Sequence, residues 1–222
     1  MNGKQKSPES ITLDAVAATL RRYSGIYRYL KPRYQTVMLQ SLQDVWSGPH
    51  ERILDVGGGT GVIAQCLAEH FPTDKVTAID VADRFHPDLS VDHKVYNGQV
   101  IPFADQSFDA VTMNNVLHHV PRAGRTVLLR EIARVSRGPL YIKDHLPLGA
   151  LDNARLAALD FIGNVPFGGM VQAEYLPMEE WQKLADDTGF KIREMRGGEY
   201  RSGPFAMVFP NRLEITMRWD RS

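Results

Sequence analysis

Apolar residues along the chain change their spacing several times. Between residues 11 and 46 they recur at helical spacing, with breaks at Gly25 and Pro32, which predicts two or three helices. Short apolar runs with helical patterns between several of them then predict strands: RILDV, KVTAID, KVY, FDAVTM and GPLYI. Farther along, helical spacing returns over residues 151–162 and 178–189, and the runs FKIREM and RLEITMRW predict two final strands.

This order of elements predicts the fold class. Apolar strands that alternate with helices are typical of a parallel sheet covered on both faces. We therefore expect an α/β fold, a doubly wound Rossmann-like sheet of about seven strands, five parallel plus a C-terminal antiparallel pair. A chain of 222 residues with 43% apolar content can fill one sizeable core, so residues 1–222 are expected to form a single domain.

Composition excludes some partners. Lys plus Arg equals Asp plus Glu at 26 each, so no net field draws the protein to nucleic acid or to an anionic membrane. The single cysteine, Cys66, cannot form an internal disulfide, and the start MNGKQKSPES lacks the apolar core of a signal peptide. We expect a cytoplasmic monomer or homodimer that binds no nucleic acid and no membrane.

The stretch LDVGGGTGVIA places a glycine turn between a strand and a helix. Glycines there permit positive φ and let the backbone approach a ligand at the carboxyl edge of the sheet. Gly59, Gly61 and Ala64 also satisfy a dinucleotide-binding pattern, and Asp80 follows at the spacing of a ribose ligand, so an NAD-dependent oxidoreductase is an alternative. Asp55, just before the glycines, favours a cationic, phosphate-free cofactor, because a carboxylate there would repel a pyrophosphate.

Taken together, these motifs resemble the class I methyltransferases that use S-adenosylmethionine, in particular their ubiquinone-biosynthesis-like, type-11 group. ILDVGGGTG matches the D-x-G-x-G-x-G signature of these enzymes, AID the acidic end of their second strand, and IPFADQSFDAV and LLREIARVSRG the segments before their fourth and fifth strands. The resemblance implies that residues 51–143 bind the cofactor and that residues 144–222 hold the acceptor. Residues 11–46 and the helices after strand five would form a lid. A non-catalytic cofactor-binding protein is a further alternative.

The resemblance also implies which residues bind the cofactor. Gly57 and Gly59 would line its methionine end, Asp80 would accept from the ribose hydroxyls, and Tyr27 would reach its carboxylate. Asn97 stands where many relatives carry an Asp that accepts from the adenine amino group, and its amide oxygen can accept the same bond. The full set is Tyr27, Asp55, Gly57, Gly59, Asp80, Val81, Asn97, Gly98 and Asn114.

The acceptor is predicted to be a small molecule. NNVLHH lacks the proline turn that base-amine methyltransferases carry after strand four, and Cys66 lies too early in the chain to be a cytosine-attacking nucleophile. A hydroxyl oxygen is the favoured acceptor atom, with carbon or nitrogen as alternatives. His145, just past the expected fifth strand, is the predicted general base, and Asp144 would orient its ring or bind substrate.

The predicted helix over residues 151–162 leaves two interpretations open. A stripe at i+4 spacing runs from Asp152 through Asp160 to Asn164, and such a stripe is either a solvated face or a polar face turned toward His145. On the second interpretation Asp160 and Asn164 would contact the substrate, and His119 and Tyr175 are further predicted substrate contacts. Asp144, His145 and Asp160 could then also hold Mg²⁺.

Overall fold

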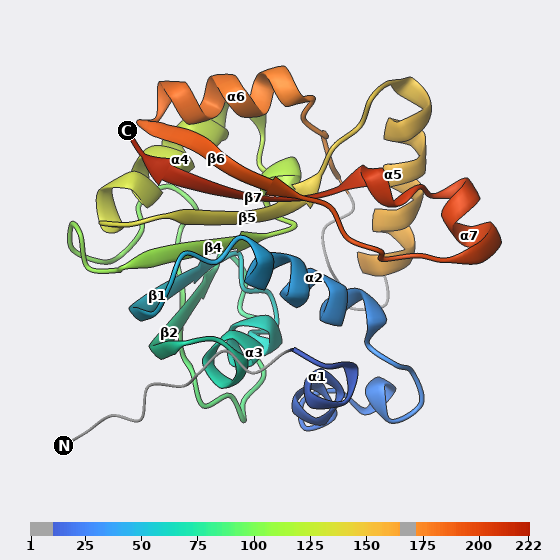
Figure 1. Ribbon diagram of the computed structural model, residues 1–222. Helices are drawn as coiled ribbons and strands as arrows, with labels where there is room; N and C mark the ends of the chain where they lie inside the picture. The colour runs from blue at the N-terminus through green and yellow to red at the C-terminus, as the bar shows by residue number, and fades with distance from the viewer. Residues whose placement is uncertain (1–10, 165–171) are drawn as a thin grey trace.

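One mixed sheet organises the protein (Figure 1). The computed structural model describes residues 11–164 and 172–222, apart from the side chains of residues 163 and 164. The strand order is β3-β2-β1-β4-β5-β7-β6, with β1 to β5 mutually parallel and β7 antiparallel to both β5 and β6. The strands are β1 (His50–Val56), β2 (Thr73–Asp80), β3 (Asp92–Val95), β4 (Ala110–Asn114), β5 (Leu140–His145), β6 (Phe190–Arg196) and β7 (Glu214–Arg221). The predicted fold class, including the C-terminal antiparallel pair, is confirmed.

Helices cover both faces of this sheet. They are α1 (Leu13–Leu20), α2 (Arg33–Asp44), α3 (Val62–His70), α4 (Arg122–Val135), α5 (Ala150–Asn164), α6 (Met178–Asp187) and α7 (Gly203–Val208), with short 3₁₀ turns η1 (Gly25–Arg28), η2 (Leu117–His119) and η4 (Asn211–Leu213). One core packs α1, α2 and α3 on one face, and another packs α4 and α6 on the other (Figure 1). Alternate residues of β1 enter alternate cores, since Ile53 packs with the first and Leu54 with the second.

The fifth strand is longer than predicted. The apolar pattern ends at Ile142, yet β5 continues through Lys143, Asp144 and His145, and all three side chains are buried. These three residues remain in the strand because β7 pairs with them in the antiparallel direction. In this pairing Glu214 lies opposite His145. His145 is therefore the last residue of the strand, where we had predicted it just beyond.

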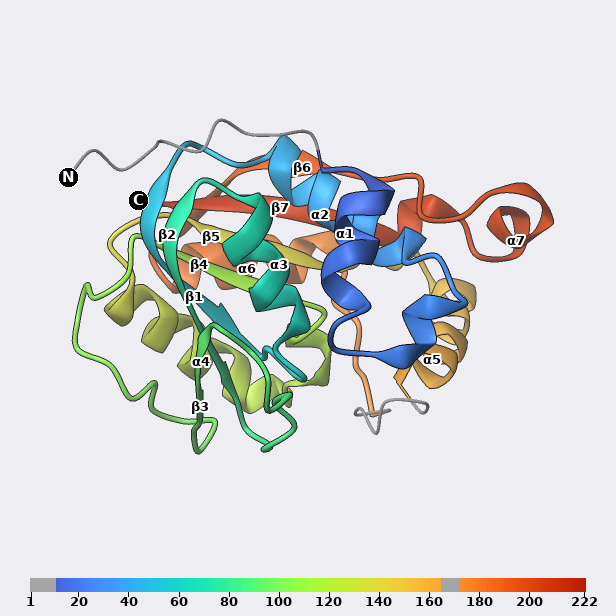
Figure 2. The same cartoon turned by 90° about the horizontal axis from the view of Figure 1, so that it is seen from below.

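Two helices lie outside the layered body. Figures 1 and 2 show α5 and α7 beyond the end of the sheet that is opposite the C-terminus, where the parallel strands have their carboxyl ends. The sequence pattern predicted α5 to within two residues at each end, but it did not predict α7, a six-residue helix. Within the described ranges, no helix has both the length and the apolar character needed to cross a bilayer.

Candidate active site

A cavity of about 1020 Å³ opens at the carboxyl edge of the sheet. Its walls come from the N-terminal segment, the glycine loop, the ends of β2, β4 and β5, and the helix α5. Tyr27 of η1 lines it, and the Tyr27 hydroxyl accepts a hydrogen bond from Gln35 Nε2 at 3.0 Å. The volume is at the upper end of the range for small-molecule sites, about 300–1,000 Å³, so there is room for more than one small ligand.

The glycine loop between β1 and α3 forms one end of the cavity. Gly57 and Gly58 donate their N–H groups to the Ile79 carbonyl at 2.8 and 3.0 Å, which draws the loop against the end of β2. Gly57 has φ +73°, and a Cβ there would lie 2.4 Å from Val116 Cγ2. Gly59 has φ +57° but open space around its Cβ direction among the described residues. Gly57 therefore requires glycine for both conformation and space, and Gly59 for conformation alone.

Asp55, at the end of β1, is buried beneath this loop. Its Oδ1 accepts hydrogen bonds from Thr112 Oγ1 at 2.7 Å and from Asn114 Nδ2 at 3.3 Å. Burial nevertheless raises the pKa of Asp55 to about 7, because two neutral donors do not replace the hydration of a carboxylate. Asn114 Oδ1 is buried and has no hydrogen-bond partner in the described part of the chain. The carboxylate of Asp55 therefore has no cationic partner, and Asn114 Oδ1 has no donor, among the described residues.

The adenosine end predicted from the sequence gathers around the end of β2. Asp80 is buried, and its carboxylate accepts from the backbone N–H groups of Gly59 at 2.8 Å and Ala82 at 2.9 Å. Val81, which is 54% exposed, and Gly98 both line the cavity. Asn97 has another role, since its side-chain oxygen accepts from the backbone N–H groups of residues 99 and 100 and so holds the turn. The adenine contact predicted for Asn97 has no support in this geometry.

The other end of the cavity is built around buried histidines. His118 Nδ1 lies 2.5 Å from Asp144 Oδ1, and both side chains are fully buried. Burial alone would lower the pKa of His118, but the carboxylates of Asp144 and Asp160 outweigh it and raise the pKa to about 9. Asp144 also accepts from the backbone N–H groups of Leu117 and His145, at 3.2 and 2.8 Å. The prediction that Asp144 orients the ring of His145 is wrong, because Asp144 contacts the ring of His118.

Asp160 turns inward from α5, so the interpretation of its stripe as a solvated face is wrong. Asp152, Leu156 and Asp160 are all buried, and Leu156 packs with Tyr175 and with Leu213 of η4. The Tyr175 hydroxyl donates to Asp160 Oδ2 at 2.6 Å, and His145 Nε2 lies 3.6 Å from Asp160 Oδ1. Tyr175 therefore supports Asp160, where we had predicted a direct substrate contact. The side chain of Asn164, predicted to bind substrate, lies outside the described residues.

Glu214, which the sequence analysis missed, connects two groups of charges. One of its oxygens contacts Lys143 Nζ at 2.5 Å and lies 3.0 Å from His145 Nδ1, and the other contacts Arg201. Burial would raise the pKa of Glu214, but Lys143 and its other cationic neighbours hold that pKa far below its usual value. Glu214 starts the last strand, about 70 residues after Lys143 in the chain, so only the β5–β7 pairing brings them together.

The Mg²⁺ site predicted from Asp144, His145 and Asp160 gains no support. Asp144 is already held by His118 and two backbone amides, which leaves little capacity for an ion. The side chains nearest Asp160 are imidazoles and a phenol, whereas Mg²⁺ prefers an octahedral shell of oxygen ligands and water.

Comparison with known proteins agrees with this architecture. Residues 54–139 match the protein family described as a methyltransferase domain. The chain is 29% identical over 144 residues to the eugenol O-methyltransferase of Ocimum basilicum, covering 63% of this chain and 40% of that protein. It is 31% identical over 91 residues to the ubiquinone/menaquinone biosynthesis C-methyltransferase of Desulfotalea psychrophila, covering 38% of this chain and 36% of that protein. The chain spans less than half the length of these curated relatives.

A solved structure shares the whole architecture. The magnesium protoporphyrin IX methyltransferase of Synechocystis, crystallised with bound S-adenosylhomocysteine (SAH), superimposes with a TM-score of 0.60 at 16% identity, covering 92% of this chain and 94% of that one. At such low identity the likeness concerns the fold. The family match, by contrast, runs from within β1 almost to β5 and includes the glycine loop, Asp80 and Asn114. It favours a methyl donor over the dinucleotide alternative. Residues 54–139 are therefore similar in sequence to the methyltransferase domain family, and the fold around them is that of the class I S-adenosylmethionine-dependent methyltransferases.

Proposed function

We propose that the protein transfers a methyl group from S-adenosylmethionine to a hydroxyl oxygen of a small molecule. The observation that supports this most is that one cavity reaches from the glycine loop and Asp80 to His145 and Asp160. A donor at one end and an acceptor at the other would share one cavity, and methyl transfer depends mainly on the alignment of the two and on the exclusion of water.

The residues at the glycine-loop end fit this donor. When bound, S-adenosylmethionine supplies an electrophilic methyl group on a sulfonium. Asp55 can ionise to accept from the α-ammonium group, and Asn114 Oδ1, which has no hydrogen-bond partner within residues 11–164 and 172–222, offers a second acceptor close by. Asp80 accepts from the backbone N–H groups of Gly59 and Ala82 and, at 3.5 Å, from Arg84 Nη2. Because a carboxylate has about four lone-pair sites, one site remains for a ribose hydroxyl.

His145 is the general base of this proposal. It lines the cavity at the end of β5, with Glu214 beside Nδ1 at 3.0 Å and Asp160 beside Nε2 at 3.6 Å. His145 would take the acceptor's hydroxyl proton while the oxygen forms its bond to the methyl carbon. The carbon–sulfur bond breaks in the same step, and its electron pair stays on sulfur. Glu214 takes, through its ion pair with His145 and without a hydrogen bond among the described residues, the orienting role that the sequence analysis gave to Asp144.

The test is an acceptor screen with isotope-labelled donor, followed by kinetics on the best acceptor. We expect His145→Gln to lower kcat about 100-fold, the lower end of the range for a general base, and to leave the Kd of SAH unchanged. His93→Gln, which removes an exposed histidine from β3, is the matched control and should keep full turnover. Full turnover by His145→Gln would exclude the base assignment. Donor binding without methylation of any acceptor would indicate the non-catalytic alternative.

Carbon methylation is the second candidate, because one of the relatives above is named a C-methyltransferase. NMR of the labelled product distinguishes the two, since a methoxy carbon and a carbon-bound methyl group have different chemical shifts.

A further inference from the structure

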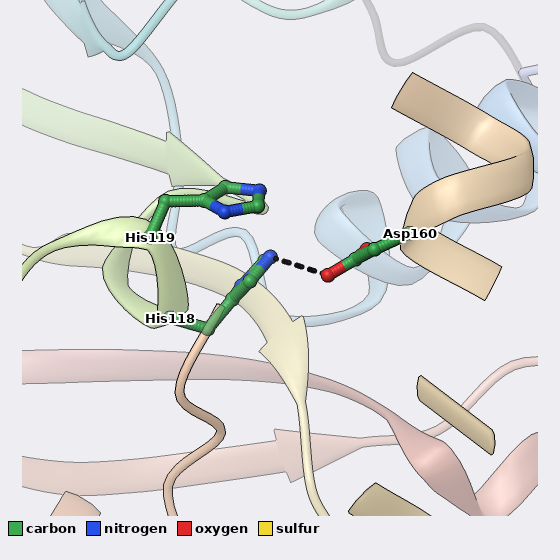
Figure 3. A group of neighbouring side chains, drawn as sticks. All are labelled: His118, His119 and Asp160. Carbon is green, nitrogen blue, oxygen red and sulfur yellow. Dashed lines mark ion pairs between the residues drawn. The ribbon is translucent and has the colours of Figure 1, made fainter. Parts of the chain in front are cut away.

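Three side chains converge on one point beside the cavity. His118 and His119 come from the turn η2, and Asp160 reaches toward them from α5 (Figure 3). Each offers one ligand atom, and these atoms lie within 4.8 Å of one another. His119 and Asp160 line the cavity, while His118 is buried behind them. The cluster therefore has both a closed side and a side that a small molecule can reach.

His118 Nε2 is the atom that calls for an explanation. The side chain is fully buried, and Nε2 has no hydrogen-bond partner among the described residues, although it lies 3.3 Å from Asp160 Oδ2. Nearly all buried polar atoms are satisfied, because an unsatisfied one costs free energy. The nitrogen and the carboxylate oxygen form a close ion pair, drawn as the dashed line in Figure 3, without a hydrogen bond between them.

That separation suits two ligands of one metal ion. Nitrogen and oxygen ligands lie about 2.1 Å from a tetrahedral Zn²⁺, which places any two of them about 3.4 Å apart. The 3.3 Å between His118 Nε2 and Asp160 Oδ2 already matches this value. The third ligand atom lies within 4.8 Å of these two and would need to approach them by about 1.4 Å or less.

The contacts behind the cluster are those of metal-binding histidines. Such a ring usually donates its other N–H to a carboxylate or a backbone carbonyl, which fixes the tautomer and aims the ligating nitrogen at the ion. His118 Nδ1 faces Asp144 Oδ1 at 2.5 Å, and His119 Nδ1 lies 2.8 Å from the carbonyl oxygen of Gln172. Tyr175 donates to Asp160 at 2.6 Å and holds that carboxylate in place.

We propose that His118, His119 and Asp160 bind a divalent transition-metal ion of the Zn²⁺ type, with its remaining coordination position toward the cavity. Two imidazoles and one carboxylate form the donor set of catalytic zinc and non-haem iron sites, whereas Mg²⁺ prefers oxygen ligands. The ligands differ from the Mg²⁺ set expected from the sequence, because Asp144 supports His118 from behind and does not touch the ion.

The role of the ion rests on the proposed methyl transfer to oxygen. A hydroxyl that occupies the open position loses its proton more readily, because the ion stabilises the negative charge on oxygen. His145, 3.6 Å from the other oxygen of Asp160, is placed to receive that proton. The metal site would then select acceptors whose hydroxyl reaches this corner of the cavity, and would extend the enzyme to alcohols of high pKa.

The experiment measures metal binding without any methyl donor or acceptor. The full-length protein is first stripped of metal with a chelator and titrated with Co²⁺, whose visible absorption reports the ligands that bind it. Zn²⁺ is then added as a competitor, and the metal content of the desalted protein is measured. We expect one ion per chain. His119→Gln and Asp160→Asn should each weaken binding at least tenfold. Asp144→Asn should weaken it about 10- to 100-fold, because His118 loses the group that orients it.

Two controls make the outcome decisive. His93→Gln removes an exposed histidine and should bind the metal as the wild type does, and circular dichroism checks that the other variants are folded. Absence of Co²⁺ and Zn²⁺ binding by the folded wild type would overturn the proposal, as would equal binding by wild type and His119→Gln. Metal binding by a protein that methylates no acceptor would refute the proposed function alone. Methylation that is unaffected by stripping would remove the ion's role in that reaction.

Discussion

The buried carboxylate of Asp55 predicts that cofactor binding depends on pH. The pKa of Asp55 is raised to about 7 by burial, so at pH 5.5 the group is about 3% ionised and at pH 7 about half ionised. The α-ammonium of the cofactor, with a pKa of about 7.7–8, stays charged over this range. If only the ionised form of Asp55 accepts from that ammonium group, the affinity rises about 15-fold from pH 5.5 to pH 7, or about 1.6 kcal/mol.

The sign of this effect differs from that of fold stability. Because the folded pKa of Asp55 lies above its unfolded value, its contribution to folding is fully present below pH 3.8 and is lost as the pH rises through about 7. Cofactor binding reverses this preference, since a bound cation favours the ionised carboxylate. Ligand binding at pH 5.5 to 6 should therefore release close to one proton from Asp55.

Isothermal titration calorimetry with SAH measures both quantities. Titrations at pH 5.5, 6.2 and 7.0 give the affinity, and buffers with different ionisation enthalpies give the number of protons released. Asp55→Asn keeps the shape of the side chain and removes its titration, so this variant should bind more weakly at pH 7 and with little dependence on pH. A constant affinity with no proton release would refute the reasoning, and so would an unchanged pH dependence in Asp55→Asn.

Two further predictions concern the loop and the core. Gly57→Ala should abolish SAH binding or unfold the loop, because its Cβ would lie 2.4 Å from Val116 Cγ2. Gly59→Ala should cost only the roughly 1–2 kcal/mol of a left-handed conformation. Calorimetry and thermal melting compare the two variants, and equal effects would contradict the steric argument. Leu156→Ala should lower the free energy of unfolding by about 2–5 kcal/mol in urea titrations, because Leu156 is fully buried with Tyr175 and Leu213, and a loss under about 1 kcal/mol would contradict that packing.

The sequence predicted the fold well because its evidence is local. Apolar runs, helical spacing and the glycine turn each lie within a few neighbouring residues, and the alternation of strands with helices admits few arrangements. The same reasoning failed at residues 143–145, where polar side chains continue a buried strand. Such residues look like a strand end until their partner is known, and the partner, Glu214, lies far along the chain.

The positions of the glycine loop and Asp80 were therefore predictable, and the directions of the side chains around His145 were not. Gly57 and Asp80 occupy positions that the strand–turn–helix order fixes by itself, because the carboxyl ends of parallel strands meet at one edge. The packing of α5 and β7 over that edge determines the direction of the Asp160 side chain. It also determines whether Asp144 contacts the ring of His118 or that of His145. Long-range packing sets these directions, because burying several charges is tolerated only where each meets an opposite charge or a hydrogen-bond partner. The tertiary structure alone supplies those partners.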